Sequence, residues 1–126
     1  MSQDRRSWQD SRGGMWFLEP ALLLLLHHRT AHGYTLIDQL AGFGLQHLQS
    51  SVVYRTLRDM EDKAWVTSSW DMDGGQGPPR RVYQLTALGD EVLREYVRDM
   101  EQAHARIADL INAYHRHIEE GEGDYH

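Results

Sequence analysis

Two pairs of arginines are the residues in this sequence best suited to binding chemistry. Arg55 and Arg58 are three positions apart, so on a helix they would share one face. Arg80 and Arg81 directly follow the glycine- and proline-rich segment 72–79, "MDGGQGPP". Guanidinium groups form paired hydrogen bonds with phosphate oxygens and with the O6/N7 edge of guanine. Both pairs therefore predict a nucleic-acid partner.

Polar neighbours extend each pair. Ser50 and Ser51 stand where a helix would start, and either could accept a hydrogen bond from the first-turn N–H groups. Tyr54 could stack on the partner or bond a phosphate, or equally serve in packing, and Gln76 lies in the glycine-rich segment. The predicted DNA-contacting set is Ser50, Ser51, Tyr54, Arg55, Arg58, Gln76, Arg80 and Arg81.

The same residues admit a second interpretation. Acidic side chains at Asp59, Glu61 and Asp62 balance the first arginine pair, as on an ordinary solvated helix face. In that case the chain would be a protein-interaction module without sequence-specific DNA binding. The basic pair at 80–81 favours the DNA-binding interpretation, and retention on heparin at low salt would separate the two.

Histidines raise the alternative of a metal-responsive regulator. His27 and His28 are adjacent and so point to different helix faces, and His32 lies beyond a helix-breaking segment. His115 and His117 are distant in sequence, and the chain has no cysteine to complete a zinc site. We expect structural histidines and no bound metal or cofactor.

Catalytic motifs are missing from the sequence. The segment "DGGQGPP" precedes a strand-like run rather than a helix, so it is not a phosphate-binding loop, and neither H-E-x-x-H nor G-x-S-x-G occurs. We expect that the protein is not an enzyme.

Composition indicates one soluble globular domain. The 126 residues are 40% hydrophobic and 25% charged, and the absence of cysteine agrees with a reducing cytoplasm. The net charge of −6 is unevenly placed. Residues 1–86 hold nine basic and nine acidic side chains, whereas residues 87–126 hold four and ten. The N-terminal part can therefore present a basic face to DNA.

The spacing of apolar residues predicts the helices and strands that must position the arginines. Residues 1–14 predict a flexible arm, with Trp8 as its apolar anchor. A first helix is expected from Pro20, in its first turn, to about Arg29. Its apolar run at 21–26 is far shorter than the roughly 20 residues of a membrane span. We expect a buried helix and no membrane partner.

Two further helices are expected before the second arginine pair. One covers about 33–41, with Tyr34, Ile37 and Leu40 or Ala41 on one face, and ends at glycines. The other opens near Ser50 and carries its apolar residues along one stripe, which leaves the arginines facing outward. That stripe comprises Val53, Leu57, Met60 and Ala64.

Two strands and a long helix complete the chain. Large or branched residues alternate in "WVTSSWD" and "RVYQLT", which predicts a hairpin whose tip is the glycine-rich segment. Thr86 is the expected N-cap of a final helix of about 30 residues, some 45 Å long. Its apolar seam from Leu93 to Ile118 is too long for its own chain to cover, so a second copy is predicted to cover it.

This order of elements is that of a winged helix-turn-helix, mainly α with a small β-hairpin wing, plus a long C-terminal dimerisation helix. The sequence resembles the PadR family of bacterial transcriptional regulators. The resemblance rests on "HGYTLIDQL", "VYRTLRDMED" and "GPPRRVYQLTALG" in this order. Val52, Arg55 and Ala64 depart from the residues common in the family, which are a small Ser or Thr, a proline and a glycine.

The resemblance implies a cytoplasmic, homodimeric regulator, usually a repressor, that binds double-stranded DNA at an inverted repeat. The third helix would enter the major groove and the wing would touch the flanking backbone. Some relatives bind a small planar apolar effector in the dimer interface, for which Trp16, Tyr96 and Met100 are candidates here. The expected domains are an arm (1–14), a winged helix-turn-helix (15–86), a dimerisation helix (87–118) and an acidic tail (119–126).

Overall fold

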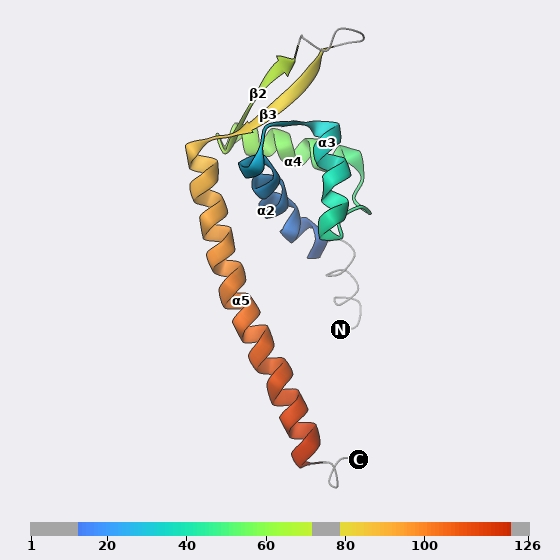
Figure 1. The fold of residues 1–126 in the computed structure, drawn as a ribbon, viewed down its shortest axis with the longest axis vertical. Coiled ribbons are helices and arrows are strands. Elements are labelled where there is room, and N and C mark those ends of the chain that lie inside the picture. Colours follow the sequence, from blue (N-terminus) through green and yellow to red (C-terminus); the bar gives the residue numbers. More distant parts are fainter. Residues whose placement is uncertain (1–12, 72–78, 122–126) are drawn as a thin grey trace. The chain divides into compact units, whose positions relative to one another are not determined.

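The computed structural model describes residues 13–71 and 79–121 of the chain. Its elements, in order, are α2 (Gly13–His28), β1 (Ala31–His32), α3 (Gly33–Gln39), η2 (Leu40–Phe43), α4 (Ser50–Asp62), β2 (Val66–Asp71), β3 (Arg80–Leu85) and α5 (Ala87–Glu120). Helices dominate, with a small sheet and a long last helix (Figure 1), which confirms the predicted fold class. The chain divides into two compact units, Met1–Leu93 and Arg94–His126.

Helix α2 begins earlier than the sequence indicated. We expected Pro20 in the first turn, but α2 starts at Gly13 and holds Pro20 in its interior. A proline there removes one backbone hydrogen bond. Burial compensates for that loss, because Leu18, Leu22 and Leu26 recur at helical spacing and are almost fully buried. The predicted arm overlaps the start of α2, and residues 1–12 lie outside the described residues.

No described helix combines the length and the apolar character that a membrane crossing requires.

Helix α3 exists where predicted, and its predicted apolar face is confirmed in part, since Leu40 is buried and Ile37 is half-buried. Leu36 and Leu40 are buried, whereas Tyr34 and Ala41 are exposed. Both sets have helical spacing, and the two leucines are the larger apolar pair at i and i+4. The short 3-10 helix η2 then ends at Gly44, whose φ of 76° is the left-handed conformation that glycine adopts without strain.

Helix α4 packs through Val53, Leu57 and Met60, all fully buried, as the stripe predicted. Ala64 does not belong to that stripe. It lies beyond the helix with φ of 66°. Its N–H bonds the Glu61 carbonyl at 2.9 Å, and the next N–H bonds the Met60 carbonyl at 2.9 Å. This is a Schellman C-cap, a position that favours glycine because a Cβ is strained there.

The sheet has three strands in the order β1-β3-β2, all antiparallel. Strands β2 and β3 confirm the predicted hairpin, and we call these two strands the wing. Of the predicted tip, residues 72–78 lie outside the described residues. The wing extends past the helices of the first unit (Figure 1). Strand β1 was not predicted, because two residues are too few to show an alternating pattern.

Thr86 caps α5, as expected. Its hydroxyl oxygen accepts a hydrogen bond from the Gly89 N–H at 2.9 Å, and the hydroxyl lies 2.7 Å from the Ala64 carbonyl and 2.9 Å from that of Trp65. Gly89 is needed where α5 begins, since a Cβ on it would collide with the Trp65 carbonyl oxygen. The start of α5 is therefore fixed to the turn that ends α4.

The rest of α5 forms the second unit. The helix is 34 residues long, or about 51 Å at 1.5 Å per residue. Within a single chain its apolar seam is largely uncovered: Val97, Ile107, Leu110, Ile111 and Tyr114 are all exposed. A solvated seam of this kind favours a helical partner.

Candidate nucleic-acid interface

The outward surface of α4 carries the first arginine pair. Because the buried stripe lies on the opposite side, Tyr54, Arg55 and Arg58 are exposed. Within residues 13–71 and 79–121, neither Arg55 nor Arg58 forms an ion pair or hydrogen bond. Their guanidinium groups are therefore available to an anion, without a competing carboxylate to displace.

Ser50 and Ser51 do not cap α4. The N-cap is Gln49, whose side chain makes no capping hydrogen bond, and its carbonyl accepts the N–H of Val52 at 3.0 Å. Both serines are instead exposed in the first turn. The sequence does not specify the N-cap, because any of the three polar residues in "QSS" could precede the first helical residue.

The second arginine pair is split between the two faces of the wing. Successive strand residues point to opposite sides of a sheet. Arg81 accordingly lies with Tyr83 on the face toward α4, opposite Trp70 in the register, whereas Arg80 contacts Tyr34 of α3. The sequence suggested the same role for both arginines. In the structure they bond different side chains, although both border a second hollow that Tyr34 and Trp70 also line.

Arg80 is supported by an aromatic side chain from α3. Its Nη1 donates a hydrogen bond to the Tyr34 hydroxyl at 3.0 Å, and its guanidinium carbon lies 5.0 Å from the centre of that ring. The Tyr34 ring is stacked on His32, whose Nε2 lies 3.0 Å from the Asp71 carboxylate. Tyr34 and His32 thus contact the end of the two strands where Asp71 pairs with Arg80, a role that their sequence positions did not indicate.

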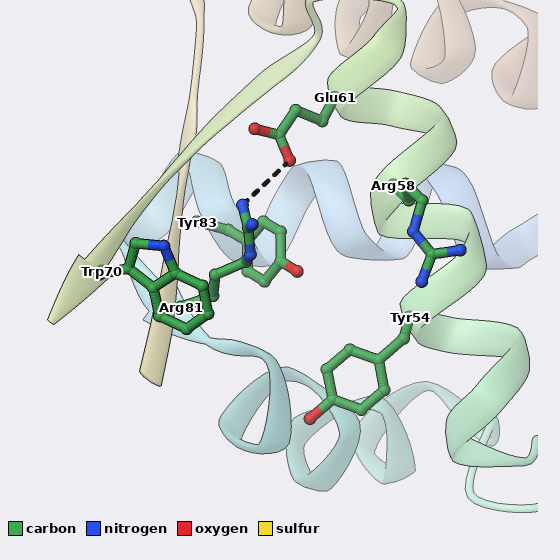
Figure 2. A pocket seen from close by; sticks show the side chains of 6 residues that line it. All are labelled: Tyr54, Arg58, Glu61, Trp70, Arg81 and Tyr83. Carbon is green, nitrogen blue, oxygen red and sulfur yellow. Dashed lines mark ion pairs between the residues drawn. The ribbon is translucent and has the colours of Figure 1, made fainter. Parts of the chain in front are cut away.

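Arg81 instead faces a hollow between α4 and the wing (Figure 2). Its Nη1 donates a hydrogen bond to the Ser68 hydroxyl at 2.6 Å and lies 3.9 Å from a carboxylate oxygen of Glu61. Ser68 in turn donates to the other Glu61 oxygen at 2.8 Å, and the Arg81 guanidinium lies 4.7 Å from the centre of the Trp70 ring. Arg81 is thus already bonded within its own chain.

This wing hollow has a volume of about 410 Å³. Figure 2 shows that three of its side chains leave α4 and three leave the wing. Two guanidinium groups and one carboxylate give it a net positive charge, and aromatic rings form much of its wall. The lining residues are Tyr54, Arg58, Glu61, Trp70, Arg81 and Tyr83.

The two hollow-lining tyrosines have different surroundings. Tyr83 is buried, and this burial raises the pKa of its phenol above the ordinary value, while the nearby Arg81 charge opposes the shift. Tyr54 is exposed, with its ring against Gly33 at the start of α3. A Cβ at position 33 would collide with that ring. The absence of a side chain at Gly33 therefore determines where Tyr54 lies.

Acidic residues of α4 are not all equivalent to Glu61. Asp59 pairs with Lys63 at 2.9 Å, one helical turn away, and the hydrogen bond to this carboxylate raises the pKa of the Lys63 ammonium. Asp62 is exposed and forms no ion pair among the described residues. Among the acidic side chains of α4 in the described part of the chain, Glu61 is the one that bonds the wing.

Three further predictions concern Gln76, the effector pocket and the histidines. Gln76 lies outside the described residues. Trp16 belongs to the first unit and is in edge-to-face contact with Phe17, whereas Tyr96 and Met100 belong to the second, so the effector pocket remains a prediction. His27 pairs with Asp90 at 3.5 Å, and no cluster of three or more potential metal ligands occurs in the described part of the chain.

The described elements define a winged helix-turn-helix protein. Helices α2, α3 and α4 form its body, α4 carries the exposed arginines, and strands β2 and β3 form a basic wing. The chain belongs to the PadR-like family of transcriptional regulators, whose family model matches residues 22–95. Members of this family are regulators rather than enzymes.

Solved structures support this assignment. One, a conserved protein described as a potential transcriptional factor, is 33% identical with a TM-score of 0.73, and the match covers 82% of this chain and 92% of that one. A PadR family regulator from Eggerthella lenta is 28% identical (TM-score 0.60), covering 71% and 80%. A PadR-like regulator from Bacillus cereus shares the fold at 22% identity (TM-score 0.67), covering 75% and 90%. A search of curated proteins found no match.

Proposed function

We propose that this PadR-like regulator binds double-stranded DNA as a homodimer and acts as a repressor. The observation that carries the proposal is the pair of exposed guanidinium groups of Arg55 and Arg58 on α4, neither of which forms an ion pair among the described residues. The buried stripe Val53, Leu57 and Met60 holds α4 against the body, so its outer face is presented rigidly. A rigid helix with exposed guanidinium groups suits entry into the major groove.

The uncovered seam of α5 supports the dimer. Five large apolar side chains between Val97 and Tyr114 are exposed in the single chain. A second copy of the same helix would cover them with a twofold axis. The two α4 helices of such a dimer would lie in successive major grooves about 34 Å apart, on an inverted repeat of roughly 10 base pairs centre to centre.

Regulation would come from a planar apolar effector that releases the repressor from its operator. The exposed Trp16 is the candidate on the first unit, with Tyr96 and Met100 on α5. A ligand that favours the DNA-free form must bind that form more tightly than the DNA-bound one, so it should weaken DNA binding in proportion to this difference.

The experiment is selection of bound duplexes from a random-sequence pool by the full chain. An enriched inverted repeat with half-sites about 10 base pairs apart is the expected result. Enrichment of a single half-site would remove the dimer from the proposal. Failure to retain any duplex at low salt would instead favour a protein-interaction role, in which Asp59, Glu61 and Asp62 oppose the positive charge of α4.

A further inference from the structure

Arg81 is bonded to Ser68 and Glu61 of its own chain, in the hollow that it shares with Arg58 of α4. We propose that Glu61 tunes the affinity of this protein for DNA by competing with phosphate for the Arg81 guanidinium. The proposal rests on the DNA-binding function proposed above. It assigns a role in DNA binding to an acidic residue, which the charge pattern alone would treat as unfavourable for a nucleic-acid partner.

The arrangement around Arg81 follows from strand register. Trp70 is directly opposite Arg81, and Ser68 is opposite Tyr83, so all four side chains share the face of the wing that looks toward α4. Glu61 comes to this face from α4 because it is three residues after Arg58, on the same side of the helix (Figure 2). Sequence-distant residues thus converge on one guanidinium.

Glu61 binds two groups of the wing at once. One oxygen accepts the Ser68 hydroxyl hydrogen at 2.8 Å, and the other lies 3.9 Å from Arg81 Nη1. Ser68 is placed between them and accepts from Arg81 at 2.6 Å. The carboxylate is therefore directed toward Arg81 by a neutral hydrogen-bonding bridge, and it does not depend on a chance surface encounter.

The contact between Glu61 and Arg81 is weak enough for DNA phosphate to compete with it. The Arg81 and Glu61 side chains are 45% and 34% exposed, so solvent screens their attraction. Exposed ion pairs of this kind change an equilibrium constant by at most about fivefold. A paired guanidinium–phosphate contact is shorter and stronger. DNA phosphate can therefore displace Glu61, but DNA binding is weakened by the contact that must be broken.

The test is a double-mutant cycle on a random-sequence duplex, titrated at one salt concentration. E61Q removes the charge and keeps the shape, and it should bind about two- to fivefold more tightly than the wild type. In an R81A background the same substitution should change affinity little. Weaker binding by E61Q, or an equal gain in both backgrounds, would overturn the proposal.

A matched control separates competition from general repulsion of phosphate. D62N removes a neighbouring acidic charge on α4 that has no arginine partner in the described structure. Any gain from D62N should persist unchanged in the R81A background. A D62N gain that depends on Arg81 as strongly as the E61Q gain would mean that local charge, rather than the Glu61 contact, sets the affinity.

A measurement without DNA keeps this proposal distinct from the proposed function. The Arg81 side-chain N–H signals, followed by NMR in the free protein, should exchange with water faster in E61Q than in the wild type. An unchanged exchange rate would show that Glu61 does not restrain the Arg81 guanidinium, which would overturn the proposal. If exchange speeds up but neither protein retains any duplex, the DNA-binding function has failed, and the competition proposal with it.

Discussion

The Arg80 guanidinium donates a 3.0 Å hydrogen bond to the Tyr34 hydroxyl, although the two residues lie 46 positions apart in sequence. This contact holds a wing cation beside α3 through a hydroxyl group, so no carboxylate takes part in it. A cation oriented in this way can meet a phosphate with little loss of side-chain freedom.

The first prediction concerns this wing cation. Arg80→Ala should weaken binding to all duplexes alike and lower the salt slope by about one, as loss of one phosphate contact requires. Tyr34→Phe keeps the ring and the charge of Arg80, so it should weaken binding less and leave the slope unchanged. Titrations over a range of salt concentrations measure both. A change of preferred sequence in Arg80→Ala would show that the wing contacts bases.

The second prediction concerns base contacts from α4. Arg55→Ala should cost about 1–3 kcal/mol on the preferred site if its guanidinium binds a guanine, with a smaller loss on random DNA. The two losses are compared at one salt concentration. Equal losses would make Arg55 a phosphate contact, and no loss on either duplex would remove α4 from the interface.

The third prediction is that Ala64 limits stability. Its φ of 66° strains an L-residue, and glycine relieves that strain at some cost in chain entropy. Ala64→Gly should therefore raise the free energy of unfolding by about 0.5–1 kcal/mol, measured by urea denaturation. Gly89→Ala is the contrasting variant, because its Cβ would meet the Trp65 carbonyl, and it should be destabilising. A less stable Ala64→Gly protein would contradict the strain argument.

The fourth prediction concerns alkaline pH. Burial raises the pKa of Tyr83 above its unfolded value, so the folded state holds this proton more tightly than the unfolded state. The resulting stabilisation is fully present below about pH 10 and declines as pH rises through the folded pKa. Tyr83→Phe should remove this part of the decline in unfolding experiments from pH 8 to 11. An unchanged profile would mean that other groups cause it.

The fifth prediction tests the seam of α5. Leu110→Glu places a charge among exposed apolar residues and should weaken dimerisation at least tenfold, about 1.4 kcal/mol. Sedimentation over a range of protein concentrations measures this change. Gln102→Glu, also at an exposed position on the same helix but off the seam, is the control and should leave the dimer intact. A fully dimeric Leu110→Glu protein would place the interface elsewhere.

Sequence patterns predicted the elements that depend on long or strongly periodic signals. The stripe on α4, the hairpin and the Thr86 cap are confirmed, because apolar periodicity and capping chemistry are local properties. The buried face of α3 was predicted only in part: Leu40 is buried, but Leu36 takes the place expected for Tyr34, because two overlapping stripes fit the same helix and only tertiary packing selects between them. Pro20 inside α2 shows that burial can override a backbone preference.

The candidate site was harder to predict than the fold. Arginines were found by type, but their neighbours depend on tertiary contacts that spacing does not encode. Tyr34 contacts Arg80, and Glu61 contacts Arg81, although the members of each pair are far apart in sequence. Alternation along a strand could have separated Arg80 from Arg81 in advance, since adjacent strand residues face opposite sides.

The double role of Thr86 joins two parts of the chain into one cooperative unit. Its hydroxyl oxygen accepts the Gly89 N–H and lies within hydrogen-bonding distance of the Ala64 and Trp65 carbonyls, while its own N–H donates to the Trp65 carbonyl. The amide protons of Trp65, Thr86 and Gly89 should therefore exchange with deuterium at similar rates, because none can open without loosening the others. The first turn of α5 and the last turn of α4 would then melt together.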